Sequence, residues 1–265
     1  MGVKPVERIV TDNIVKDMKQ YFIIKMPKAP NDIEDIQQLE REYMVIMAAG
    51  EHINLIRKEE YHSRTYLTYL ALDYAIAKSL YHYLTKTGEI DGAVNSITRN
   101  NERWTRYLFR QFIAGLKKIH EASIAHLDIK IDNVLVDIVD VDGMWEPRIK
   151  IADFGMSQIE IDLHKVTAKH GLVYRAPEIL DGAIPYDGEK ADVFASAFIL
   201  LAIFAIDNFS SNGREQVRSD AYQYFLENGH LRAYWKAKRL TPSQELQDLF
   251  AGMLQENPRE RWTVD

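Results

Sequence analysis

Three side chains that could carry out phosphate chemistry lie within eight residues, between His126 and Asn133. Asp128, Lys130 and Asn133 supply a carboxylate, an ammonium group and an amide, directly before the apolar run 134–136. Phosphoryl transfer needs a carboxylate for the proton of the attacking hydroxyl, a cation for the phosphate and an oxygen ligand for a metal. The stretch therefore predicts a phosphoryl-transfer loop that leads into a strand.

Two further motifs follow in the second half of the chain. Asp153-Phe154-Gly155 begins twenty residues after Asn133, and Ala176-Pro177-Glu178 comes later. Either triplet alone is more typical of a solvated loop. Together and in this order, the three motifs resemble those of the protein kinases, H-R-D-L-x-x-x-N, D-F-G and A-P-E.

The resemblance implies a bilobal α+β fold, and it extends from about residue 7 to residue 262. A small antiparallel-sheet N-lobe with one main helix would occupy residues 1–74. A larger, mostly helical C-lobe would occupy residues 75–265, without the last helix that is usual in the family.

The resemblance also assigns roles in catalysis and metal binding. It makes Asp128 the catalytic base, Lys130 the contact to the γ-phosphate, and Asn133 and Asp153 the magnesium ligands. Hard oxygen donors of this kind suit Mg²⁺, which keeps several waters and bridges to substrate phosphates. His126 would pack rather than act as an acid or base.

The nucleotide site would draw on the first half of the chain. Lys25 ends an apolar stretch and is similar to the kinase lysine that holds the α- and β-phosphates. Glu40 and Glu42 are both available as its partner, and the kinase pattern, counted back from residue 52, favours Glu42. Four further residues would surround adenine: Leu72 as gatekeeper, Asp73 and Ala75 in the hinge, and Leu135 beneath the ring.

Two framework contacts complete the set that the resemblance implies. Glu178 would form a buried ion pair with Arg261, and Asp192 would brace the catalytic loop from below. The chain also departs from the family pattern at several positions. The turn expected at 11–13 has no glycine, Ile23 replaces a small alanine, Leu127 replaces an arginine, and Gly171 stands where a threonine is usual.

Hydrophobic patterning predicts the elements that must position these residues. Strands are expected at 7–10, 14–18 and 21–26 with a turn at Lys19-Gln20, then a helix from Asn31 or Asp32 to Ala49. Further strands follow residue 52 and cover 66–74, and helices cover 80–84, 102–121 and 193–206. A hairpin is expected around Asp142-Gly143. The clustered aspartates near this turn suggest a calcium site as an alternative, but the segment lacks the ligand order of an EF-hand.

Composition narrows the function classes. The chain has 265 residues, a net charge of -6 and no cysteine, so disulfides, thiolate metal sites and a cysteine nucleophile are excluded. A mildly acidic chain is a poor non-specific ligand for nucleic acid. The longest apolar run, of about 14 residues, is too short for a membrane span. We expect a soluble cytoplasmic protein, and the oligomeric state is not indicated.

The function that these observations favour is ATP- and Mg²⁺-dependent phosphorylation of serine or threonine in protein substrates. Lys130 favours this class because tyrosine kinases usually lack a lysine at that place. Two alternatives stay open. One is a pseudokinase that binds partners through the same fold, and the other is a small-molecule kinase of the aminoglycoside or choline type, although those enzymes lack the element at 176–178.

Overall fold

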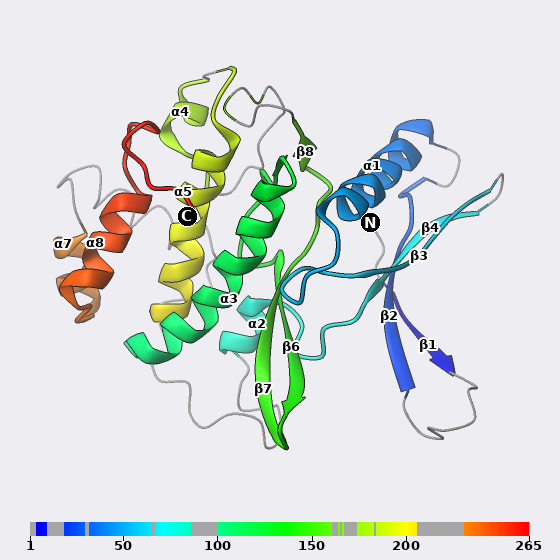
Figure 1. Cartoon of the computed structure of the whole chain (residues 1–265), viewed down its shortest axis with the longest axis horizontal. Helices are drawn as coiled ribbons and strands as arrows, with labels where there is room; N and C mark the ends of the chain where they lie inside the picture. The colour runs from blue at the N-terminus through cyan, green and yellow to red at the C-terminus, as the bar shows by residue number, and fades with distance from the viewer. Residues whose placement is uncertain are drawn as a thin grey trace.

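The structure is a computed structural model that describes residues 4–9, 19–29, 32–64, 67–85, 100–160, 164, 166, 174–182, 184–205 and 231–264. Of residues 4–9 and 19–21 it describes only the backbone. The chain forms two lobes (Figure 1): strands β1 to β4 with helix α1 make the small lobe, and the remaining helices make the large one.

The small lobe is an antiparallel sheet in the order β1-β2-β4-β3. Its strands are β1 (Lys4–Ile9), β2 (Lys19–Lys25), β3 (Lys58–Arg64) and β4 (Leu67–Asp73). The turn predicted at Lys19-Gln20 is wrong, because both residues belong to β2 and lie opposite Ile9 and Arg8. Their place in the ladder with β1 outweighs the weak turn preference of two polar residues. The strand predicted at 14–18 lies outside the described residues.

Helix α1 (Ile33–Ala49) carries one of the predicted site residues against the sheet. Of the two candidate caps, Asp32 is the N-cap: its carboxylate accepts hydrogen bonds from the backbone N–H groups of Glu34 (2.8 Å) and Asp35 (3.3 Å). Gly50 ends the helix with φ 70°, a conformation that favours glycine. The predicted helix, including its end at Ala49, is confirmed.

The large lobe is built around α5 (Gly188–Phe204), which packs against α3 (Glu102–Glu121) and α8 (Gln244–Met253). From residue 191 to its end, every residue of α5 is buried, because this helix is apolar on all sides. Helix α3 is amphipathic and buries one face. The lobe also contains α2 (Leu80–Thr85), α4 (Pro177–Leu180), α7 (Arg232–Lys238) and the paired short strands β5 (Ile124–Ala125) and β8 (Gln158–Ile159).

A long hairpin of β6 (Val134–Val141) and β7 (Met144–Ile151) links the two catalytic motifs. Asp142 and Gly143, with φ 53° and 81°, form the predicted two-residue turn. The strands are paired up to the residues on either side of this turn, Val141 and Met144. Within the described residues, no group of three or more acidic, histidine or cysteine side chains could hold a metal ion, so the calcium alternative has no support there.

Among the described helices, none combines the length and the apolar character that a bilayer crossing requires.

Candidate active site

Lys25 lies between two carboxylates at the junction of the lobes. Its Nζ is 2.5 Å from Oε1 of Glu42 and 2.9 Å from Oδ1 of Asp153. The other candidate, Glu40, is exposed, and helical geometry turns it away from the lysine. Glu42 comes from α1, Lys25 from β2 and Asp153 from the segment after β7, so three distant parts of the chain meet at one ammonium group.

The charges of this cluster are set by burial and by mutual attraction. Burial alone would lower the pKa of Lys25, but Glu42 and Asp153 outweigh it and the pKa is raised. Burial likewise opposes ionisation of Asp153, yet Lys25 draws the pKa of this carboxyl below its ordinary value. Burial raises the pKa of Glu42, because the loss of hydration destabilises its carboxylate more than the attraction of Lys25 stabilises it. At neutral pH, Lys25 is therefore a cation and Asp153 an anion.

The loop from residue 126 to residue 133 holds Asp128 in a fixed orientation. Oδ2 of Asp128 accepts hydrogen bonds from Nζ of Lys130 (2.6 Å) and from Nδ2 of Asn133 (2.9 Å). The same amide nitrogen of Asn133 also donates to the backbone carbonyl of Asp128 at 2.9 Å. The structure thus brings together the carboxylate, the ammonium group and the amide that the sequence places within eight residues.

The donor set of Asn133 and Asp153 fits a magnesium ion. Both hydrogen bonds of the Asn133 amide use its nitrogen, and its Oδ1 accepts no hydrogen bond from any described residue. The side chain of Asp153 is 45% exposed, and Lys25 contacts only one of its oxygens. The backbone N–H of Ala152 donates to the carbonyl of Asn133 at 2.9 Å, which joins the two segments that carry these oxygens. An amide oxygen and a carboxylate oxygen are ligands that Mg²⁺ prefers.

Asp192 on α5 supports the catalytic loop from within the large lobe. Its fully buried carboxylate accepts hydrogen bonds from the backbone N–H groups of His126 (2.7 Å) and Leu127 (2.8 Å). It also lies 3.0 Å from Nε2 of His120 on α3. Burial opposes the charge on Asp192, but the contact with His120 and the backbone donors lower the pKa of the carboxyl.

His126 occupies a packing position. Burial lowers the pKa of its imidazole, so the ring is neutral at pH 7. Its Nδ1 accepts a hydrogen bond from the backbone N–H of Asp128 at 3.3 Å, and its Nε2 lies 3.2 Å from the carbonyl of Ala152. The ring also packs against Phe154, with 5.2 Å between the ring centres.

Leu127 takes the place of the kinase arginine and lies in an apolar setting. It is fully buried in a small cluster with Ala125, Val166, Tyr186 and Ala191. Its backbone has φ 63°, an uncommon conformation for a branched residue, and the hydrogen bond from its N–H to Asp192 helps to hold it there. An apolar side chain in this cluster gives an incoming phosphate no hydrogen-bond donor.

The predicted hinge connects β4 to α2. Leu72 and Ala75 are buried, and Leu135 is half-buried opposite Ser79. The side chain of Asp73 accepts a hydrogen bond from the backbone N–H of Arg57 at 2.8 Å and forms an ion pair with Lys150. The structure thus ties the hinge to both lobes through Asp73.

The ion pair between Glu178 and Arg261 joins α4 to the C-terminal segment. Nη1 and Nη2 of Arg261 donate to the two oxygens of Glu178 at 2.7 Å and 2.9 Å. The guanidinium also donates to the backbone carbonyl groups of Lys190, Gln255 and Glu256, and its centre lies 5.0 Å from the Phe194 ring. All of this occurs with the arginine side chain fully enclosed.

Sequence reasoning missed two supporting residues, Lys150 and His120. Lys150 pairs with Leu135 across the hairpin, so it lies on the hinge-facing side of β7. Alternation along the strand could have indicated this orientation, but not its partner Asp73. His120 falls on the buried face of α3, where its contact to Asp192 depends on how two helices pack.

Comparison with known protein families identifies the family of this chain. A sequence model of the protein kinase domain matches residues 9–265, nearly the whole chain. The chain belongs to the protein kinase family.

Several named kinases are similar to this kinase chain. A probable serine/threonine-protein kinase of Dictyostelium discoideum is 32% identical over 168 residues, covering 63% of this chain and 18% of that protein. The probable serine/threonine-protein kinase HSL1 of Saccharomyces cerevisiae is 29% identical over 85% of this chain and 13% of its own length. The NUAK family SNF1-like kinase 2 of Rattus norvegicus is 30% identical over 72% of this chain and 28% of its own length. The chain thus spans less than a third of each of these relatives.

The departures of this kinase from the family pattern are only partly described. The turn at 11–13 and Gly171 lie outside the described residues. The ends of the strands that flank this turn are described, and Ile9 lies opposite Lys19. Lys19 is six residues along β2 from Lys25, which corresponds to about 20 Å of strand.

Proposed function

We propose that this kinase transfers the γ-phosphoryl group of ATP to serine or threonine hydroxyl groups of protein substrates. Asp128 accepts the proton of the attacking hydroxyl while its oxygen forms the new bond to phosphorus. The bond between the γ-phosphorus and the bridging oxygen breaks, and ADP leaves. Lys130 neutralises charge on the transferred group, and Lys25 binds the α- and β-phosphates.

Asn133 and Asp153 would hold Mg²⁺, which neutralises phosphate charge when it is bound. Leu72, Asp73, Ala75 and Leu135 would surround the adenine. We place the division of the lobes between residues 74 and 75, because β4 ends at Asp73 and α2 begins at Leu80. An enzyme that consumes ATP works where ATP is abundant, which favours the cytoplasm.

The observation that carries the proposal is the orientation of Asp128 by Lys130 and Asn133, next to the cluster of Lys25, Glu42 and Asp153. Catalysis of phosphoryl transfer consists mainly of positioning and charge neutralisation, and these residues provide both. Lys130 supports serine and threonine hydroxyl groups of proteins as acceptors, and so do the names of two relatives, which are called probable serine/threonine-protein kinases.

The direct test incubates the purified chain with labelled ATP, Mg²⁺ and a generic protein substrate such as casein. We expect label on serine and threonine after acid hydrolysis. The turn without glycine favours one second candidate, a pseudokinase. Binding of ATP with Mg²⁺ but no transfer to any protein substrate would contradict the enzyme and support that alternative.

We predict that Asp153→Ala abolishes the thermal stabilisation of the chain by ATP in the presence of Mg²⁺. Removing this carboxylate takes away the more exposed of the two metal-ligand candidates and one of the two anions beside Lys25. A ligand that binds only the folded state raises the melting temperature, so the measurement is the shift with ATP and Mg²⁺ minus the shift with Mg²⁺ alone. Asp140→Asn on the exposed part of the hairpin is the control, and an unchanged shift in Asp153→Ala would contradict the assignment.

We also predict weak binding of ATP, with a Kd of about 0.1–1 mM, or roughly 4–5.5 kcal/mol. The turn expected before Lys25 has no glycine, and repulsion between Asp12 and the phosphates would keep that turn clear of them. The ends of β1 and β2 that flank this turn lie about 20 Å along the strand from Lys25. Calorimetry with ATP and Mg²⁺ measures the affinity. A low-micromolar Kd would mean that another segment closes over the phosphates.

A further inference from the structure

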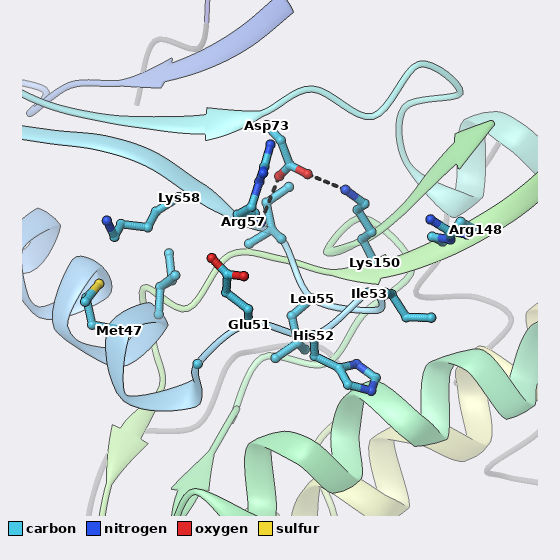
Figure 2. Close-up of a pocket in the computed structure, with 13 residues that line it drawn as sticks. Met47, Glu51, His52, Ile53, Leu55, Arg57, Lys58, Asp73, Arg148 and Lys150 are labelled. Carbon is cyan, nitrogen blue, oxygen red and sulfur yellow. Dashed lines mark hydrogen bonds and ion pairs between the residues drawn. The ribbon is translucent and has the colours of Figure 1, made fainter. Parts of the chain in front are cut away.

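A pocket of about 510 Å³ lies behind the hinge, between the end of α1, the segment that follows it and strand β7 (Figure 2). Of the predicted site residues, only Asp73 lines it. Its volume falls within the range of pockets that bind ligands. Ile46, Leu55 and Ile56 contribute buried apolar surface, whereas Ile53 is 64% exposed at the opening.

The lining of this back pocket is positively charged although the whole chain carries a net charge of -6. Four cationic side chains face two carboxylates; they are Arg57, Lys58, Arg148 and Lys150 against Glu51 and Asp73. His52 adds no charge at neutral pH, because partial burial and then Lys118 lower the pKa of its imidazole. Glu59 and Asp137, which lie outside the lining, offset part of this charge, so the attraction for anions depends on the cations that carry no ion pair.

Two of these cations already have partners. Lys150 pairs with Asp73 and lies 3.8 Å from Asp137, and Arg57 pairs with Glu59.

The other two cations, Arg148 and Lys58, form no ion pair with any described residue. The ammonium group of Lys58 lies 5.9 Å from the centre of the Tyr43 ring, a contact that leaves its hydrogens available. Arg148 and Lys58 are therefore the groups that an incoming anion would engage without breaking an existing pair.

The arrangement of these two cations favours an elongated ligand. In Figure 2, Lys58 lies at one end of the pocket and Arg148 at the other, with Leu55 and the carboxylate of Glu51 between them and Ile53 near Arg148. A single small anion would engage one end only. A chain with an acidic group at each end and an apolar group between them would match both cations and the apolar surface.

We propose that the back pocket binds an acidic peptide segment of a protein partner, in which two carboxylate side chains flank an apolar one. Nucleic acid offers the anions but no aliphatic group for Ile53 and Leu55, and the net charge of the chain disfavours it. This binding does not depend on phosphoryl transfer, so its failure would leave the proposed catalytic function intact.

The test uses the full chain and three fluorescein-labelled peptides in which two glutamates flank a leucine at three different separations. Fluorescence anisotropy measures binding at protein concentrations up to about 1 mM, which detects binding free energies of roughly 4 kcal/mol. We expect saturable binding of at least one peptide. Arg148→Gln and Lys58→Gln should each weaken it by at least about threefold, because each removes one charged contact. Ile53→Ser should also weaken it.

Arg103→Gln and Lys236→Gln are matched controls, since both residues are exposed, lie outside the pocket and change the net charge equally. A peptide with lysines in place of the glutamates controls for the sign of the charge. Three results would overturn the proposal: no saturable binding of any acidic peptide, equal loss in the pocket and control variants, or equal binding of the lysine peptide. The affected side chains lie outside the core, and thermal melting of each variant verifies folding.

Discussion

Replacing Asp128 with asparagine is expected to lower kcat by about 10²–10⁴-fold, the usual contribution of a positioned general base. The amide keeps the shape of the carboxylate but cannot accept the proton of the substrate hydroxyl. Nucleotide binding should change little, because the proposed contacts to ATP are made by Lys25, Asp153 and the hinge. The measurement is steady-state transfer of labelled phosphate, together with the Kd of ATP by calorimetry.

Asp140→Asn makes the same chemical change at an exposed position of β6 and should leave turnover intact. The melting temperature of each variant separates lost chemistry from lost folding. This comparison matters because Asp128 accepts hydrogen bonds from two neighbours that would have to adjust to an amide. If Asp128→Asn retains more than about a tenth of the activity, its role as base is wrong.

The second large effect concerns stability. Arg261→Ala should lower the free energy of unfolding by about 3–5 kcal/mol, the usual cost of removing one partner of a buried ion pair. The variant leaves the carboxylate of Glu178 without its two donors at 2.7 Å and 2.9 Å. It also leaves the backbone carbonyl groups of Lys190, Gln255 and Glu256 without the guanidinium. Urea denaturation followed by circular dichroism gives the free energy.

Arg259→Ala is the matched control, because this arginine lies two residues away and is exposed. Its loss should change the free energy of unfolding by less than about 0.5 kcal/mol. Equal stability of Arg261→Ala and the unaltered chain would mean that water replaces the guanidinium at no cost, against the enclosure seen here. The double variant Arg261→Met with Glu178→Leu should recover part of the loss, since apolar pairs can substitute for buried charges.

Sequence alone predicted the parts of this kinase in which the chemically active residues lie close together along the chain. Asp128, Lys130 and Asn133 lie within one short loop, so their proximity follows from chain connectivity. The helix at 33–49 could be predicted because a capping aspartate, an apolar face and a terminal glycine agree. The turn at Lys19-Gln20 could not be excluded, because what decides it is pairing with β1, a contact between separate strands.

The same limit applies around the hinge. The preference for Glu42 over Glu40 came from the kinase pattern, and the ion pair itself requires α1 to pack on the sheet. The bond of Asp73 to Lys150 and the back pocket depend on how β7 of one lobe meets β4 of the other. Such contacts leave no local periodicity in the sequence, and only the assembled fold reveals them.

Asp192 makes the order of the catalytic loop a property of the whole large lobe. Its carboxylate bonds to groups that lie 65, 66 and 72 residues earlier in the chain. Closing loops of this length costs conformational entropy. The hydrogen bonds and packing that offset this cost form only when α5 has docked against α3. During synthesis, the loop that carries Asp128 is complete long before the residue that fixes its backbone emerges. Catalytic competence therefore arises late in folding, together with the large lobe, and a chain shortened before α5 would keep the motif without its geometry.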